Sequence, residues 1–158
     1  MSRFSHLDED GNSIMVDVSK KEDTERSASA MGSVVMSPKT LALIMNRGVK
    51  KGDVLSVAQL AGIIAAKKTP DLIPLCHPLG LSSVKVELTC DSDHSAVNIF
   101  ANCKLTGKTG VEMEALTAVA VAALTVYDMC KSVDRGMHLT DIRLVHKAGG
   151  KSGVFNAD

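Results

Sequence analysis

Aromatic residues are scarce in this sequence, which has no Trp, one Tyr and three Phe among 158 residues. Because aromatic side chains supply much of the buried area of many cores, this core must be built from Val, Leu, Ile, Ala and Met. Hydrophobic residues make up 45% of the chain, which is enough for a core at this length. We expect one domain over residues 1–158, with a flexible N-terminus to about residue 12 and a flexible tail from about residue 148.

Neither sign of charge is in excess. Eighteen Lys and Arg residues balance eighteen Asp and Glu residues, so the chain lacks the basic surplus that is typical of nucleic-acid-binding domains. No apolar run of membrane-spanning length is free of polar residues, and the N-terminal MSRFSHLDEDG lacks the apolar centre of a signal peptide. These absences predict a soluble, cytoplasmic protein that binds neither nucleic acid nor a membrane.

Metal-ligand spacing is also missing. The four cysteines form no C-x-x-C pair, so we expect reduced thiols and no metal ion. Four of the five histidines have no ligand spacing and are predicted to be surface residues; they are His6, His94, His138 and His146.

A phosphate-binding P-loop is absent as well, although two glycine-lysine sequences resemble its end. The motif G-x-x-x-x-G-K-[ST] requires a glycine where Asn102 precedes Gly107-Lys108-Thr109 and where Val145 precedes Gly150-Lys151-Ser152. The first loop nevertheless places glycine amides and Lys108 beside a predicted helix N-terminus, which suits an anion. A tight strand-to-helix turn explains the same residues equally well.

The spacing of apolar residues and of turn and cap residues predicts an α+β domain. The residues around Pro74 and Pro78 should be irregular, because proline lacks an N–H and restricts its predecessor. The predicted elements are an extended piece at 15–19, a strand over 27–37, helices over 38–45 and 53–67, a hairpin of strands over 82–90 and 96–105, a long helix over 110–133 and a last strand over 139–147. This order is the split βαβ, or ferredoxin-like, pattern, with one antiparallel sheet and helices on one face.

The hairpin prediction also bears on the cysteines. If the turn pairs Cys90 with about Ser95, then Cys103 lies well down the partner strand and cannot reach Cys90. No disulfide is therefore expected.

The stretch LTGKTGVEMEALTAVAVAALTVYDMCK, residues 105–131, is the candidate site. Residues 115–126 are all Ala, Val, Leu or Thr, so their helix is apolar on nearly every side and predicts oligomerisation. Charged residues flank this segment, where an unpartnered charge would be costly. They are Glu112, Glu114, Asp128 and Lys131.

Glu114 and Asp128 fall on one side of the predicted helix. Fourteen residues separate them, or about 21 Å at helical rise, which is too far for one small ligand to touch both within a chain. Either the two ends serve different sites or two subunits share each site. Asp128 and Lys131 would also be explained by a simple i, i+3 ion pair on the surface.

Cys76 and His77 are adjacent in an extended segment, where neighbouring side chains point in opposite directions. Mutual activation as a nucleophile and base is therefore not expected. A packed thiol beside a ligand-facing histidine fits the pattern better.

Five segments in this order resemble the MoaC family of molybdenum cofactor biosynthesis proteins, over about residues 13–155. They are MVDVS, KGDV, AGIIAAKKTPDLIPLCHPL, LTGKTGVEMEALTAVAVAALTVYDMCK and GGKSG. LIPLCHP and GKTGVEMEAL at this spacing are the specific ones. The resemblance implies a ferredoxin-like subunit in a hexamer, arranged as a trimer of dimers with active sites between subunits.

The resemblance also implies a lyase activity, cyclic pyranopterin monophosphate synthase. Its GTP-derived substrate, (8S)-3',8-cyclo-7,8-dihydroguanosine 5'-triphosphate, comes from a radical-SAM GTP cyclase as the functional partner. The products are the pterin with a cyclic phosphate and pyrophosphate, and no metal or organic cofactor is expected.

Family positions can be carried onto this chain residue by residue. The catalytic positions match Asp128, Lys51 and Lys131, and the substrate-contacting segments match Leu75-Cys76-His77 and Met113-Glu114. Lysine, aspartate and histidine can move the protons that such a ring rearrangement requires near neutral pH. We add to the predicted substrate-binding set the neighbouring Glu112 and two candidate phosphate-binding cations, Lys67 and Lys147.

Two classes of function are consistent with the sequence. The first is the lyase, and the second is a non-catalytic oligomeric module that binds a purine nucleotide or a pterin. The enzyme needs Asp128, Lys51 and Lys131 together, whereas the module needs only the cations that face the phosphates.

Overall fold

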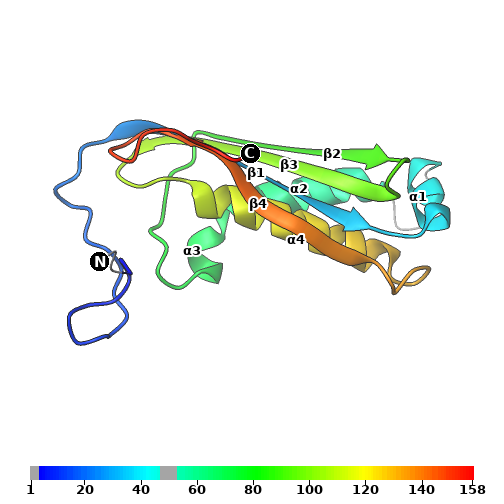
Figure 1. Ribbon diagram of the computed structural model, residues 1–158, viewed down its shortest axis with the longest axis horizontal. Helices are drawn as coiled ribbons and strands as arrows, with labels where there is room; N and C mark the ends of the chain where they lie inside the picture. Colours follow the sequence, from blue (N-terminus) through cyan, green and yellow to red (C-terminus); the bar gives the residue numbers. More distant parts are fainter. Residues whose placement is uncertain (1–3, 47–52) are drawn as a thin grey trace.

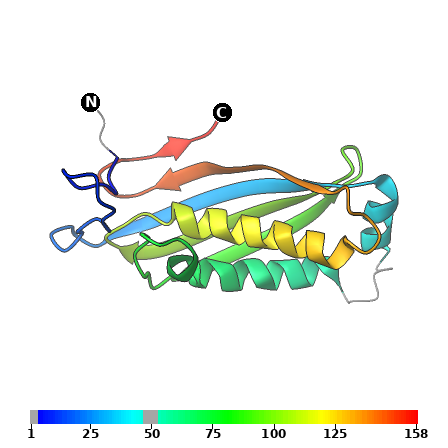
Figure 2. The same ribbon diagram turned by 90° about the horizontal axis from the view of Figure 1, so that it is seen from below.

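The protein, described from a computed structural model that covers residues 4–46 and 53–158, has a five-stranded antiparallel sheet in the order β2-β3-β1-β4-β5. Helices α2 and α4 lie side by side along one face of the sheet (Figures 1 and 2). The predicted α+β class is therefore confirmed. The elements are β1 (Thr24–Val35), α1 (Pro38–Met45), α2 (Val54–Lys67), α3 (Thr69–Leu72), β2 (Ser83–Asp91), β3 (Ala96–Gly107), α4 (Glu112–Cys130), β4 (His138–Ala148) and β5 (Phe155–Asn156).

The core lies between the sheet and the two long helices. Alternate residues of the strands face the helices, and one side of α4 completes the layer. Small residues are needed there: a Cβ atom on Gly62 of α2 would lie 2.9 Å from the Ala118 carbonyl oxygen of α4. Core residues from β1, β3 and α4 include Ala28, Ala30, Val34, Val97, Ile99, Ala101, Ala115, Ala118, Ala122 and Val126.

Side-chain caps start the first two helices, as the sequence predicts. The Ser37 hydroxyl accepts a hydrogen bond from the Thr40 amide at 3.3 Å, and the Asp53 carboxylate accepts one from the Leu55 amide at 3.0 Å. Thr69 and Pro70 follow the end of α2 and begin the single turn α3. Proline fits there because the first helical turn needs no N–H from it.

The hairpin register differs from the predicted one. Cys90 pairs with Val97, not with about Ser95. The turn covers residues 92–95, one residue later than the predicted 91–94. Within it the Asp91 carboxylate accepts hydrogen bonds from the amides of Asp93 and His94, and Ser95 adopts a positive φ of 49°. Cys103 lies opposite Val84, and all four cysteines are free thiols, as predicted.

The C-terminal segment, predicted to be a flexible tail, folds back to form β5, where Phe155 pairs with Lys147. The turn that reverses the chain contains Gly149 at φ +99°, and a Cβ atom there would lie 2.1 Å from the Glu25 carbonyl oxygen. Only glycine fits so close to β1. At the other end of the chain, the predicted extended piece at 15–19 forms no strand. The N-terminal arm (residues 4–23) contains an isolated bridge between Leu7 and Ser13.

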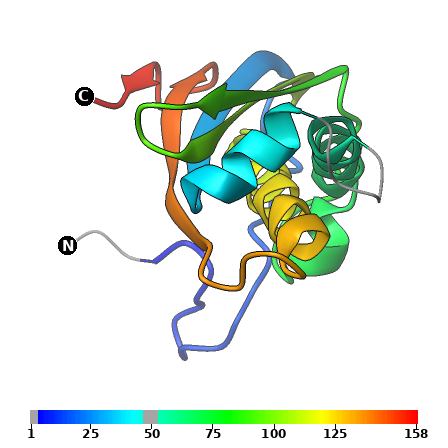
Figure 3. The ribbon, with the colours of Figure 1, turned by 90° about the vertical axis from the view of Figure 1, so that its right-hand side faces the viewer.

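One described helix, α4, is long and apolar enough by length and composition to cross a membrane, and 56% of its most apolar window is buried inside the fold. Such burial is that of a core helix. Leu124 remains 56% exposed on its outer side. Among the described residues, no helix covers the opposite face of the sheet (Figure 3). Polar side chains pair there instead; for example, the Ser33 hydroxyl donates to Oδ1 of Asn98 at 2.7 Å.

Candidate active site

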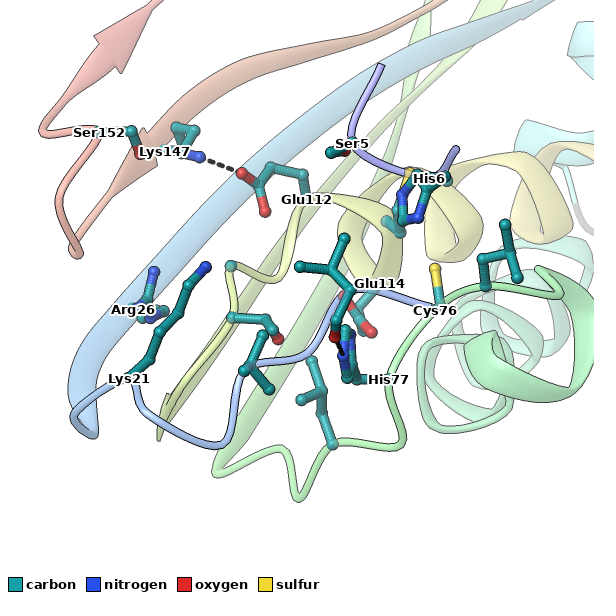
Figure 4. A pocket seen from close by; sticks show the side chains of 17 residues that line it. Ser5, His6, Lys21, Arg26, Cys76, His77, Glu112, Glu114, Lys147 and Ser152 are labelled. Carbon is teal, nitrogen blue, oxygen red and sulfur yellow. Dashed lines mark hydrogen bonds and ion pairs between the residues drawn. The ribbon is translucent and has the colours of Figure 1, made fainter. Parts of the chain in front are cut away.

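A cavity of about 380 Å³ lies at the N-terminal end of α4 (Figure 4). Its size is within the range of small-molecule sites. Separate parts of the chain line it, namely the N-terminal arm, the start of β1, the loop after α3 and the start of α4. The end of β4 and the turn after it lie on one side of the cavity. The lining residues are Ser5, His6, Val16, Val18, Lys21, Arg26, Leu75, Cys76, His77, Leu79, Thr109, Gly110, Glu112, Met113, Glu114, Lys147 and Ser152.

The start of α4 gives this cavity two acids, Glu112 and Glu114. No side chain of the described residues caps the helix at Val111, but within the first turn the Glu114 carboxylate accepts a hydrogen bond from its own backbone amide. Glu112 forms an ion pair with Lys147 of β4, and both side chains are about three-quarters buried. This pair closes the helix onto the last long strand of the sheet.

Glu114 is the most deeply buried acid of the site, with 3% of its surface exposed. Burial raises its pKa to about 7, and the nearby charge of Glu112 adds to the effect. A carboxyl group with this pKa exchanges a proton near neutral pH, which suits general acid–base chemistry.

The raised pKa of Glu114 has a measurable effect on stability. The folded protein binds this proton more tightly than the unfolded chain, so stability is lost as the pH rises from 4.5 to about 7. Gln cannot ionise, so the free energy of unfolding of Glu114→Gln relative to the wild type should be higher at about pH 8 than at about pH 4.5, by up to roughly 3 kcal/mol. Urea denaturation at both pH values measures this difference.

Glu87→Gln provides the matched control, because Glu87 is exposed and pairs with Lys85 at 2.8 Å on the sheet surface. Its difference from the wild type should be nearly the same at both pH values. An equally flat result for Glu114→Gln would contradict the raised pKa.

Cys76 and His77 both line the cavity but do not act on each other. Burial raises the pKa of the Cys76 thiol, and the charge of Glu114 raises it further, so the sulfur stays protonated and is a poor nucleophile. The Nε2 atom of His77 lies 2.6 Å from the Val16 carbonyl oxygen and must donate to it, since a carbonyl only accepts. His77 therefore holds the N-terminal arm over the cavity.

Cations gather on one side of the cavity, where Lys21 and Arg26 lie near Lys147 (Figure 4). The guanidinium of Arg26 is fixed by hydrogen bonds to the carbonyls of Gly107 at 3.0 Å and Lys108 at 3.1 Å. A second cavity of about 670 Å³ continues from this side, and its lining adds Lys20 and Lys151. Such a cluster suits a polyanionic group.

Lys108, a candidate anion ligand from the glycine-lysine loop, has a structural partner instead. Its Nζ atom donates to the Ser19 carbonyl oxygen at 3.0 Å and does not line the cavity. The turn interpretation of this loop therefore explains Lys108, while the loop residues Thr109 and Gly110 do line the site.

The structure brings most, but not all, of the predicted site residues together. Seven line the cavity: Leu75, Cys76, His77, Glu112, Met113, Glu114 and Lys147. Lys67 is exposed at the end of α2 and does not line it. Asp128 and Lys131 lie at the opposite end of α4, where they form an exposed ion pair at 2.6 Å. Lys51 lies outside the described residues.

Three ionisable residues of the cavity were not predicted from the sequence to belong to a site, namely His6, Lys21 and Arg26. His6 was predicted to be a surface residue, and although it is exposed it also lines the cavity. Arg26 carries a weak signal, because it is the one arginine of β1, where small or apolar residues follow it as far as Val35. Lys21 has no signal in the KKED run.

Comparisons with known proteins identify the family of this chain. The MoaC family matches residues 15–150. The cyclic pyranopterin monophosphate synthase of Rhodospirillum rubrum is 69% identical over 98% of this chain and 93% of its own length. Those of Dinoroseobacter shibae and Pelotomaculum thermopropionicum are 61% and 59% identical, over 100% and 98% of this chain and 100% and 91% of their own lengths. This chain therefore belongs to the MoaC family.

Proposed function

We propose that this protein is a cyclic pyranopterin monophosphate synthase, a lyase of molybdenum cofactor biosynthesis. It converts (8S)-3',8-cyclo-7,8-dihydroguanosine 5'-triphosphate into cyclic pyranopterin monophosphate and pyrophosphate. The observation that carries this function is a single cavity in which a buried acid with a pKa of about 7 adjoins a cluster of cations. Relatives with this activity in their names are up to 69% identical over nearly the full chain.

The two sides of the cavity match the two parts of this substrate. Glu114, buried beneath the start of α4, faces the part of the cavity that suits a heterocycle, whose nitrogens gain and lose protons during rearrangement. Lys21, Arg26 and Lys147 supply positive charge for the triphosphate, and the second cavity leaves room for the pyrophosphate that departs.

The protein works as a hexamer in this proposal, a trimer of dimers in which two chains form each site. Asp128 and Lys131 lie about 21 Å along α4 from Glu114, so one small substrate reaches both ends only if they come from different chains. An apolar stripe on α2 supports assembly with further copies of this chain, since Val57, Leu60 and Ile64 recur at helical spacing and are 42–59% exposed.

The cellular setting belongs to the same proposal. The substrate is supplied by a radical-SAM GTP cyclase, and the reaction takes place in the cytoplasm without a metal or organic cofactor of the protein itself. Protonation and phosphate transfer within the substrate require only the Lys, Asp, Glu and His side chains that this chain provides.

The test is incubation of the purified protein with the cyclised dihydro-GTP, followed by assay of cyclic pyranopterin monophosphate and of pyrophosphate. Both products should form in equal amounts. Arg26→Ala should raise KM strongly because it removes a fixed cation, while Lys85→Ala should behave like the wild type, since Lys85 lies on the sheet surface beside Glu87. Failure of the wild type to form either product would overturn the proposed function.

One observation favours a second candidate, a non-catalytic module that binds a purine nucleotide or a pterin. The cavity of a single chain already combines cations with Glu114, whereas Asp128 and Lys131 lie away from it. Tight binding of the substrate without turnover, unaffected by Asp128→Ala, would favour this module over the enzyme.

A further inference from the structure

The N-terminal arm contributes a second histidine to the cavity. His6 lines it about 70 residues before Cys76 in the chain, and Figure 4 shows the ring on the same side as Cys76, across from Lys21 and Arg26. The heterocycle side of the cavity therefore has one imidazole from the arm and one, His77, from the loop after α3. His77 already donates to the arm. Within the part of the chain that the structure describes, the hydrogen-bond partner of the His6 ring is Ile14, in the same turn as His6.

A compact turn holds His6 in this place. The backbone amide of Ile14 donates to the His6 carbonyl at 3.0 Å, and the bridge between Leu7 and Ser13 follows directly. Inside the turn, the Asp8 carboxylate accepts hydrogen bonds from the Asn12 amide at 2.8 Å and from the Asn12 side chain at 3.1 Å. These bonds lower the pKa of Asp8, which therefore stays ionised and keeps the turn closed at neutral pH.

The same turn favours one tautomer of the ring. Nδ1 of His6 lies 3.4 Å from the Ile14 carbonyl oxygen. Because a carbonyl oxygen only accepts, Nδ1 carries the proton, and the lone pair of a neutral ring is on Nε2. A histidine oriented in this way by a backbone carbonyl has the arrangement of a general base, with its acceptor nitrogen left for a ligand.

We propose that His6 is a substrate-contacting residue whose Nε2 accepts a proton from an N–H or O–H group of the nucleotide-derived ring during turnover. The N–H or O–H bond of the substrate breaks, its electron pair stays on the substrate, and the proton on Nε2 makes an imidazolium that later returns it. This inference rests on the proposed function. The other ionisable side chains that face the same cavity are Lys21 of the arm and, from other parts of the chain, Arg26, Cys76, His77, Glu112, Glu114 and Lys147.

His6→Asn separates this role from a structural one. An Asn amide can keep the donor near Nδ1 and its bond to Ile14, but it has nothing at the Nε2 position. His6→Asn should therefore lower kcat by about 10²–10⁴-fold while the thermal unfolding curve stays close to the wild type. His6→Ala should be equally slow, and added imidazole should restore part of its activity.

His94→Asn is the matched control, because its Nδ1 also has a local partner, the Asp91 carboxylate at 2.9 Å, on the hairpin turn. Its kcat should stay within about twofold of the wild type. If His6→Asn keeps the wild-type kcat, or if His6→Gln restores it with an amide that cannot accept a proton, His6 is not the proton acceptor. An inactive wild type would instead defeat the proposed function, and this inference with it.

Discussion

Asp128→Ala and Lys131→Ala are each expected to lower kcat by about 10³-fold or more, the loss seen when a residue acts directly on the reacting groups. The resemblance to the family predicts a catalytic role for both residues, and each holds the other in place through a contact of 2.6 Å. The hydrogen bond from Lys131 to Asp128 raises the pKa of Lys131, and the charge of Asp128 adds to the effect, so the amine stays protonated as a potential acid.

The same substitutions should leave the fold almost unchanged. The side chains of Lys131 and Asp128 are 55% and 63% exposed, and exposed ion pairs of this kind contribute little to stability. Asp71→Ala is the control, because Lys68 and Asp71 form an exposed pair with the same i, i+3 spacing at 3.8 Å. Its kcat should match the wild type.

Steady-state kinetics and thermal unfolding measure these effects together. Lys51→Ala belongs to the same set by its match to the family, although Lys51 lies outside the described residues. An Asp128→Ala variant with a kcat within about twofold of the wild type would contradict the catalytic assignment.

Local signals in the sequence predicted most of the fold. Ser37 and Asp53 mark the first residues before α1 and α2 because their side chains satisfy free amides there. Alternating apolar residues identify β2 and β3 because one face of each strand packs against helices. The hairpin register was not predicted because it depends on the turn, where the Asp91 carboxylate accepts hydrogen bonds from the amides of Asp93 and His94. The alternation of apolar and polar residues does not report such bonds.

The candidate site was predictable only where the chain carries a specific motif. The LCH and GVEME sequences locate the loop after α3 and the start of α4, and both line the cavity. Arg26 was not predicted because its position at the cavity depends on the pairing of β1 with β3. That pairing places Arg26 opposite Leu105 and beside the carbonyl of Gly107. His6 reaches the cavity only because the arm folds across it, a long-range contact without periodicity.

If two chains share each active site, two inactive variants should complement each other within one oligomer. Glu114 is buried in the first turn of α4 and Asp128 is exposed in its last turn, about 21 Å apart at helical rise. A substrate that touches both must draw them from two chains. Glu114→Gln and Asp128→Ala should therefore be inactive alone, yet regain activity when the two chains are combined in one oligomer.

The fraction of active sites in such a mixed oligomer follows from the random combination of the two variants. In an equal mixture, each site has an even chance of an intact residue from each of its two chains, so about a quarter of the sites should be active. Sites made from one chain would all carry one lesion and stay inactive. The control is a mixture of Asp128→Ala with Lys131→Ala, whose lesions belong to the same end of α4 and should not complement each other.

Reassembly from the separated chains, followed by assay of pyrophosphate release, tests the shared site most directly. Light scattering must first show hexamers, and tagged subunits must show that the two variants occur in the same particles. The account predicts recovery to about a quarter of the wild-type rate for Glu114→Gln mixed with Asp128→Ala, and none for Asp128→Ala mixed with Lys131→Ala. Complete exchange of subunits without any recovered activity would contradict it and would confine each active site to a single chain.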